Sequence, residues 1–192
     1  MTHLVTTLAA LEIGGVTQKL LAFSALFAKW NASINLSAAR TPAEVEEHLV
    51  DSLHVIPYLR ASERVIDVGS GGGFPVVIAA ICLPISQFTA LEPVHKKHAF
   101  LRTAARELGL VNLESFARRV EDHDVHDYDA AMSRATFDLR EWIETGRSLV
   151  HPGGIVLGFE AVQRDDLSPP FERHPYQLNG KQRAIIVAPR AP

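Results

Sequence analysis

The feature that most constrains the fold is a glycine-rich turn that follows a short apolar run. Residues 64–68 have the pattern of a buried strand, and four glycines lie within residues 69–73 directly after it. Glycine adopts positive φ readily and lets a ligand approach the backbone closely. Since an apolar helix pattern follows over 75–82, the segment predicts a strand, a turn that binds a ligand, and a helix.

The spacing of the glycines favours a nucleoside ligand that has no pyrophosphate. A dinucleotide-binding turn has the pattern G-x-G-x-x-G, and Phe74 occupies the place of its last glycine, which disfavours a nicotinamide oxidoreductase. A phosphate-binding Walker A loop is excluded because no Gly-Lys-Ser/Thr follows. Glu92 ends the next predicted strand, where a carboxylate can accept hydrogen bonds from ribose hydroxyls. The turn and Glu92 together predict a site for S-adenosylmethionine.

Strands and helices alternate along the rest of the chain. Further strands are predicted at 87–91, 112–116, 129–132 and 155–159, and helices at 95–108 and 137–149. Asn179-Gly180 between two apolar runs predicts a closing hairpin. The alternation predicts an α/β fold whose mostly parallel sheet is covered by helices on both faces.

The first sixty residues have helical patterns. Apolar residues recur at three- and four-residue spacing over 16–30, and Thr41, Pro42 and Glu44 have the arrangement of a capping box that begins a second helix. This second helix is expected to be limited by Pro57. We therefore expect a helical N-terminal extension over 1–60 and a core over 61–192, together forming one compact domain.

Composition excludes several classes of protein. An apolar content of 47% with 21% charged residues is ordinary for a globular enzyme. No apolar run approaches the roughly 20 residues of a membrane span, and residues 1–10 lack the basic region of a secretory signal. Cys82 is the single cysteine, so no intrachain disulfide can form, and the histidines have no metal-ligand spacing. A cytoplasmic protein without a metal is expected.

Several short segments, taken together, resemble one family of enzymes. They are Lys29-Trp30-Asn31, Asn35-Leu36-Ser37, His48-Leu49-Val50-Asp51-Ser52-Leu53, Asp67 to Pro75, Lys96-Lys97, Phe100-Leu101-Arg102, Arg119-Val120-Glu121 and Ser133-Arg134-Ala135. The glycine turn alone indicates only a broad class, whereas the His-x-x-Asp-Ser-Leu and Ser-Arg-Ala segments are specific. The family is that of the bacterial 16S ribosomal RNA guanine-N7 methyltransferases, called RsmG or GidB.

The resemblance implies a class I S-adenosylmethionine-dependent methyltransferase fold, which is Rossmann-like with an antiparallel C-terminal hairpin. It implies 16S ribosomal RNA or the small ribosomal subunit as the substrate, and a monomer is expected. The implied cofactor contacts are Asp67, Gly69, Gly71, Gly73, Phe74 and Glu92, with Val120 and Glu121 around the adenine and Arg134 near the methionine end or the target base. Substrate contacts are expected at His48, Asp51, Lys96, Lys97 and Arg183. Plain packing is the alternative for Val120, a surface ion pair for Arg134, and a solvated helix face for the lysines.

The groups that the chain lacks also bear on the reaction. Guanine N7 has an unshared electron pair and loses no proton on methylation, so no catalytic base is expected. Pyrimidine C5 methylation needs a cysteine nucleophile, and Cys82 lies in an apolar helix pattern that indicates a core position.

The chain departs from the family pattern at two positions. Phe159-Glu160-Ala161 stands where the family usually has Leu-Lys-Gly, so we expect an anion on the rim that faces the RNA. Arg183 is shifted by one residue, which is expected to turn its side chain to the opposite face of the strand. The alternatives are a methyltransferase of the same fold that acts on another RNA or a small molecule, and a noncatalytic cofactor-binding or ribosome-binding module.

Overall fold

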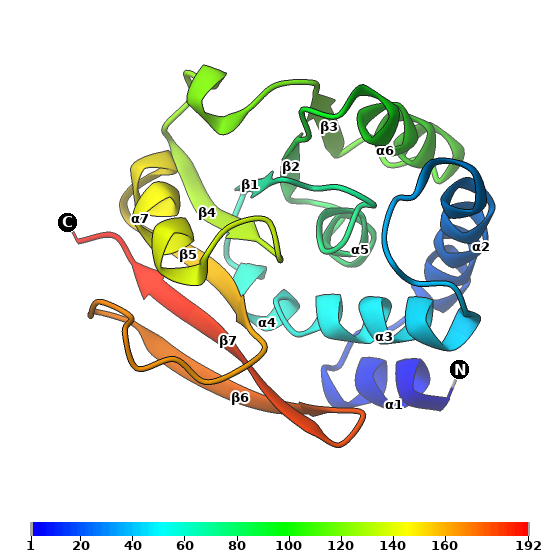
Figure 1. The fold of residues 1–192 in the computed structure, drawn as a ribbon, viewed down its shortest axis with the longest axis horizontal. Coiled ribbons are helices and arrows are strands. Elements are labelled where there is room, and N and C mark those ends of the chain that lie inside the picture. The colour runs from blue at the N-terminus through cyan, green and yellow to red at the C-terminus, as the bar shows by residue number, and fades with distance from the viewer. Residues whose placement is uncertain (1, 192) are drawn as a thin grey trace.

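Seven strands form one mixed sheet in the order β3-β2-β1-β4-β5-β7-β6 (Figure 1). The computed structural model describes residues 2–191. The strands are β1 (Arg64–Val68), β2 (Gln87–Leu91), β3 (Leu113–Phe116), β4 (Tyr128–Ser133), β5 (Val150–Glu160), β6 (Glu172–Leu178) and β7 (Lys181–Pro189). β1 to β5 pair in parallel, and β7 pairs antiparallel with both β5 and β6. The predicted α/β class with a closing hairpin is confirmed.

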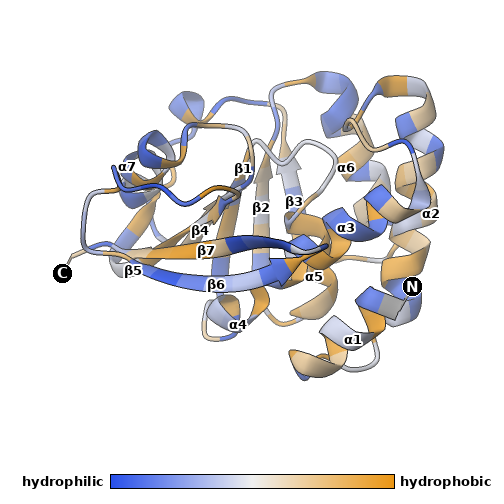
Figure 2. Cartoon of the chain, turned by 60° about the horizontal axis from the view of Figure 1, so that its bottom comes forward, coloured by the Kyte–Doolittle hydropathy of each residue, from blue (hydrophilic) through white to orange (hydrophobic). Residues whose placement is uncertain are grey.

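Helices cover both faces of the sheet. They are α1 (Thr2–Ala10), α2 (Thr17–Ile34), α3 (Pro42–Leu53), α4 (Ile56–Leu59), α5 (Val76–Cys82), α6 (His95–Glu107) and α7 (Leu139–Leu149), with a short 3-10 helix η1 (Val120–Asp122). Side chains alternate across β1, so Val65 packs into the core under α2 to α6 while Ile66 and Val68 pack under α7. Figure 2 shows α5 as almost wholly hydrophobic and β6 as largely hydrophilic, which fits a central helix and an edge strand.

The N-terminal helices share a core with the sheet rather than standing apart from it. Phe23 and Phe27 of α2 meet Phe74 with ring centroids 5.2 and 5.0 Å apart, and Phe27 lies 6.0 Å from Phe100 of α6. Asn31 is buried, donates to the Ala39 carbonyl and accepts from the Ser37 amide, which fixes the loop between α2 and α3. That loop is thereby held beside the glycine turn.

Two element boundaries differ from the sequence prediction. α3 begins with the predicted capping box at Thr41 but ends at Leu53, and Pro57 lies in the first turn of α4, where its missing N–H removes no helix bond. β5 begins at Val150 rather than 155, because the backbone of residues 150–154 finds partners in β4 and in Arg190. Among residues 2–191, no helix has the length and apolar character needed to cross a membrane.

Candidate functional site

A cleft of about 530 Å³ opens at the carboxyl ends of β1, β4 and β5. The glycine turn forms its floor, the α2–α3 loop and α3 form one wall, and the segment after β4 and the closing hairpin form the other. In open α/β sheets, the crevice at the carboxyl ends of the strands is where ligands bind. The fold therefore places the sequence-predicted turn where a ligand site is expected.

Most backbone amides of the glycine turn already donate hydrogen bonds within the protein. Gly69, Gly71 and Gly73 have φ of 73°, 52° and 84°, which only glycine adopts without strain. The amides of Gly69 and Ser70 donate to the Leu91 carbonyl, Gly71 donates to Glu92, and Gly73 donates to Ser70. These four amides are not free to bind a pyrophosphate, so the turn fits a nucleoside without phosphates better than a dinucleotide.

Two observations test whether the turn fits S-adenosylmethionine. A Cβ built on Gly71 would meet only the Gly69 carbonyl at 3.7 Å and Glu92 Oε2 at 4.0 Å, so the turn leaves space for a ligand at this point. Asp67 is buried below the turn, and its Oδ2 has no hydrogen-bond partner among residues 2–191. Burial raises the pKa of its carboxyl to about 7. Asp67 lies just beneath the lining of the cleft, and an ammonium group such as that of methionine that approached it through the turn would satisfy this carboxylate, so the charge of the site fits the cofactor.

Glu92 is the support of the turn in this structure. Its Oε2 accepts the Gly71 amide and its Oε1 accepts the Val94 amide, both at 2.8 Å. The side chain is 4% exposed and lies behind Gly71 rather than in the wall of the cleft. Each carboxylate oxygen of Glu92 retains a second lone pair with which to accept a hydrogen bond. The contact of Glu92 with a ribose remains a prediction.

A buried carboxylate, Asp51 of α3, joins the two walls of the cleft. It accepts from Arg134 Nη1 at 3.0 Å and from the Tyr176 hydroxyl at 2.6 Å, and Arg183 Nη1 lies 3.6 Å away. Arg134 lies over the ring of Phe74, 5.3 Å from its centroid. Arg183 also donates to Glu47 at 3.1 Å. Asp51 therefore fixes the guanidinium of Arg134 above the floor of the cleft.

The expectation of a free anion at Glu160 is wrong. Glu160 is 4% exposed, and Arg173 of β6 binds its two oxygens at 2.7 and 3.0 Å. The Arg164 amide donates to the same carboxylate. The charge is neutralised inside the hairpin wall because the side chain of Arg173 reaches Glu160 across β7, so Glu160 does not repel an RNA phosphate from the rim.

Arg183, which was expected to contact the substrate, lines the cleft despite its shift of one residue. Arg183 pairs across the hairpin with Tyr176, and both side chains line the cleft. The register of β7 sets this face, with Ala184 paired to Glu160 of β5. Arg183 therefore belongs to the site, although its guanidinium binds Glu47 and approaches Asp51.

The structure brings some of the predicted site residues together and separates others. Gly69, Gly71, Phe74, Arg134, His48, Asp51, Lys97 and Arg183 all line the cleft. Val120 and Glu121 instead line a smaller cavity of about 280 Å³ beside α7. Gly73 faces the core, since a Cβ there would lie 2.6 Å from Val77, and Lys96 is exposed outside the cleft. The roles of these residues in binding remain predictions.

Two side chains of the cleft were not predicted from the sequence. Thr136 donates to the Gly69 carbonyl, and a Cβ on Gly69 would lie 2.3 Å from its hydroxyl. Tyr176 supplies the hydrogen bond to Asp51. The sequence does contain a signal for Tyr176, because a two-residue turn at Asn179-Gly180 places residues 176 and 183 opposite each other. Nothing in the sequence indicated Thr136, whose contact crosses between two loops.

Neither the single cysteine, at the end of α5 away from the glycine turn, nor the histidine of the cleft is well suited to catalysis. Burial raises the pKa of the Cys82 thiol to about 12, so it is protonated at neutral pH. Burial, with a contribution from the charge of Arg134, lowers the pKa of His48, whose ring packs 5.4 Å from that of Phe74. Within residues 2–191, no group of three His, Cys, Asp or Glu side chains is placed to hold a metal ion.

We expect Tyr176→Phe to lower the free energy of unfolding by about 1.5–3 kcal/mol, because it removes a hydrogen bond to a buried charged carboxylate. Urea unfolding measures the change. Tyr58→Phe is the matched control, since the Tyr58 hydroxyl makes no hydrogen bond with the described residues. Equal losses in the two variants would mean that the bond to Asp51 does not stabilise the cleft.

A family model matches most of the chain. The family model described as GidB, rRNA small subunit methyltransferase G, matches residues 16–182. A ribosomal RNA small subunit methyltransferase G of Burkholderia ambifaria is 42% identical over 174 residues, which span 85% of this chain and 76% of that protein. The protein of the same name from an Azoarcus species is 42% identical over 159 residues, or 81% and 75% of the two chains.

Solved structures with low sequence identity share the fold. The O-methyltransferase TomG of Streptomyces achromogenes, solved in complex with SAM, is 14% identical with a TM-score of 0.63, covering 88% of this chain and 90% of that one. The S-adenosylmethionine-dependent methyltransferase SibL is 18% identical with a TM-score of 0.62, covering 79% and 57% of the two chains. At this identity the likeness extends to the fold alone, which is that of class I methyltransferases.

Proposed function

The chain belongs to the rRNA small subunit methyltransferase G family, and from this premise we propose that its cleft binds S-adenosylmethionine and methylates N7 of one guanine in 16S ribosomal RNA. The observation that carries the assignment of the cleft is the glycine turn above Asp67, whose buried Oδ2 is without a partner among the described residues. A ligand with an ammonium group satisfies that oxygen, and the space at Gly71 admits a ribose.

The roles proposed for Gly69, Gly71 and Arg134 follow from where these residues lie, whereas those proposed for Val120 and Glu121, which line a separate cavity, rest on the resemblance to the family. Asp67 holds the ammonium end of the cofactor, and Gly69 and Gly71 let its sugar lie against the turn. Glu92 keeps the Gly71 amide in place and is proposed to accept from the ribose. Val120 and Glu121 are proposed to border the adenine. Arg134, fixed by Asp51 over Phe74, is proposed to orient the methionine carboxylate or the target base.

S-adenosylmethionine supplies an electrophilic methyl group on a sulfonium ion. Guanine N7 attacks with its own electron pair, so the protein needs to position the base rather than remove a proton. The side chains that line the cleft agree with this requirement, since Asp51 is engaged by two arginines and a tyrosine and burial lowers the pKa of His48. The guanidinium plane of Arg134, which lies over the buried ring of Phe74, provides a flat surface against which a base can stack.

Glu160 gives no support to a small-molecule acceptor, because Arg173 neutralises it. We propose that the enzyme acts as a monomer in the cytoplasm, where small ribosomal subunits are assembled.

The proposal is tested by methyl transfer from labelled S-adenosylmethionine to small subunits from a strain that lacks its own guanine-N7 enzyme. We expect label on N7 of one guanine. Cofactor binding without transfer to the subunit would contradict the proposed substrate, and no cofactor binding would contradict the proposed site.

A further inference from the structure

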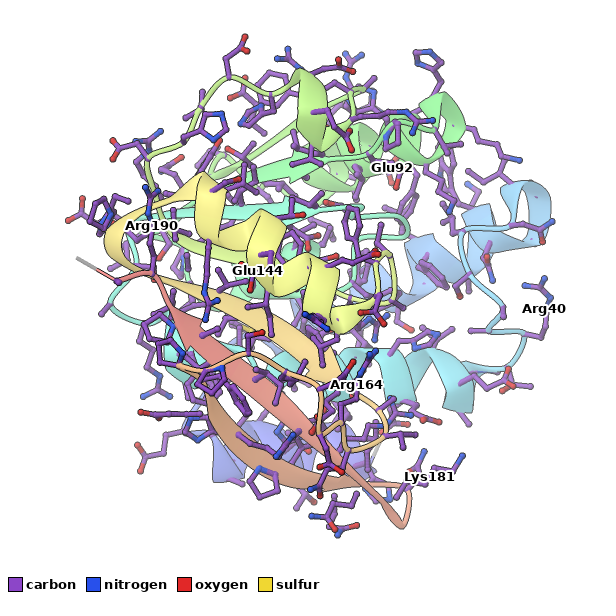
Figure 3. The ribbon with its side chains drawn as sticks, turned by 60° about the vertical axis from the view of Figure 1, so that its left-hand side comes forward. Arg40, Glu92, Glu144, Arg164, Lys181 and Arg190 are labelled. Carbon is purple, nitrogen blue, oxygen red and sulfur yellow. The ribbon has the colours of Figure 1, made fainter. Side chains whose placement is uncertain are left out.

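The cations around the cleft differ in whether a carboxylate neutralises them. On the hairpin side, Arg134 binds Asp51, Arg173 binds Glu160, Arg183 binds Glu47, and Arg164 binds Asp138 and Asp166. Their side chains are between 13 and 33% exposed. Figure 3 labels Arg164 on this side, beside α7 and the hairpin. An RNA phosphate would have to displace a carboxylate to reach any of these four arginines.

Helix α6 carries cations that have no strong carboxylate partner among the described residues. Lys96, Lys97 and Arg102 form no ion pair with any of residues 2–191, and Arg106 has only its exposed neighbour Glu107 at 3.7 Å. Exposed ion pairs of this kind are weak. At about 100° per residue, Arg102 and Arg106 point within about 40° of each other and Lys96 lies about 80° from Arg106, so these three side chains share about one third of the helix surface, whereas Lys97 points about 180° away from Arg106. Arg102 and Arg106 line a shallow depression there with Ala99 and Thr103.

The N-terminal end of α6 lies at the mouth of the cleft. Lys97 lines the cleft itself, and α6 starts three residues after Glu92, which supports the glycine turn. His98 Nε2 lies 3.0 Å from the Ser115 carbonyl and fixes the helix against β3. From Lys96 to Arg106 the helix rises about 15 Å, enough to face several phosphates of one strand.

We propose that the α6 face, defined by Lys96, Arg102 and Arg106, binds the phosphate backbone of the 16S ribosomal RNA that flanks the target guanine. The hairpin-side arginines are then internal to the wall of the cleft and do not grip the RNA. The inference rests on the proposed function and adds to it the direction from which the RNA approaches. Charge complementarity selects this face, since Lys96 and Arg102 have no carboxylate partner among residues 2–191 and Arg106 has only the exposed Glu107.

The test compares two double variants with the same change in net charge. Lys96→Gln with Arg102→Gln removes two cations of the α6 face that lie outside the cleft. Lys19→Gln with Lys181→Gln removes two exposed lysines elsewhere, one on α2 and one on the hairpin. Binding to small ribosomal subunits is measured over a range of salt concentrations, and affinity for S-adenosylmethionine is measured in parallel to show that each variant is folded.

We expect the α6 variant to bind small subunits roughly tenfold more weakly near 0.1 M salt. The slope of log K against log salt should fall by about 1.4–1.8, because each phosphate contact contributes about 0.7–0.9. The control should keep the slope of the unaltered protein. An unchanged slope in the α6 variant, or an equal loss in the control, would overturn the inference. Failure of the unaltered protein to methylate the subunit would instead contradict the proposed function.

Discussion

Gly71→Leu is expected to lower the affinity for S-adenosylmethionine at least about a hundredfold while the chain stays folded. The leucine Cβ would lie 3.7 Å from the Gly69 carbonyl and 4.0 Å from Glu92, which are ordinary contacts, so the protein itself accommodates it. The rest of the side chain would enter the cleft at the place proposed for the ribose. A hundredfold loss corresponds to about 2.7 kcal/mol of binding free energy.

The backbone cost of the substitution has to be separated from its effect on the cleft. A side chain at φ near 52° costs roughly 1–2 kcal/mol wherever it lies. Gly109→Leu is the matched control, since Gly109 has φ of 60° at the end of α6 and no atom within 4 Å of its Cβ position. Calorimetric titration and urea unfolding should show similar losses of stability in both variants and a loss of affinity only for Gly71→Leu. Retained affinity in a folded Gly71→Leu variant would exclude the turn from the cofactor site.

Asp67→Asn is expected to change stability and cofactor affinity in opposite directions. Burial raises the pKa of Asp67 from 3.8 to about 7, so the folded state binds this proton more tightly than the unfolded state does. The resulting stabilisation is complete below about pH 4 and is lost as pH rises to about 7. The neutral amide does not titrate, so Asp67→Asn should be the more stable protein at pH 8 in the absence of ligand.

The expected gain at pH 8 is on the order of 2 kcal/mol. One pK unit corresponds to about 1.4 kcal/mol, and the unpartnered amide group reduces the gain, because a buried donor without an acceptor costs about 1–3 kcal/mol. Cofactor affinity should fall at least tenfold, since the ammonium loses its counter-charge. Unfolding curves at pH 4, 6 and 8 measure the first effect, with Asp124→Asn, at an exposed position, as the control. A stability difference that is the same at all three pH values would show that Asp67 does not titrate in this range.

The sequence predicts those parts of the fold that depend on short local patterns of residues. The capping box at Thr41 begins α3, the glycine turn follows β1, and Asn179-Gly180 closes the hairpin, each within a few residues of its signal. Pro57 was misread because proline ends one helix and begins another with equal ease. Local signals therefore gave the order of the elements more reliably than their ends.

The parts of the site that the sequence did not predict depend on contacts between distant segments. Whether Glu160 is a free anion depends on Arg173, whose side chain reaches it from β6 across β7. The direction of Arg183 depends on its pairing with Tyr176 and on how β7 aligns with β5. A one-residue change of register reverses such a result, and no local pattern fixes it.

The carboxylate of Asp51 also has a consequence for the order in which the molecule is completed. Its partners Arg134 and Tyr176 follow it by 83 and 125 residues. A chain emerges from the ribosome N-terminus first, so Asp51 is made long before either partner and stays solvated until the final strands dock. The central parallel strands can pair earlier, because their residues are already present. During synthesis the cleft is therefore completed after the central strands of the sheet. A nascent chain that stops short of Tyr176 has those strands but lacks the hairpin that completes the second wall of the cleft.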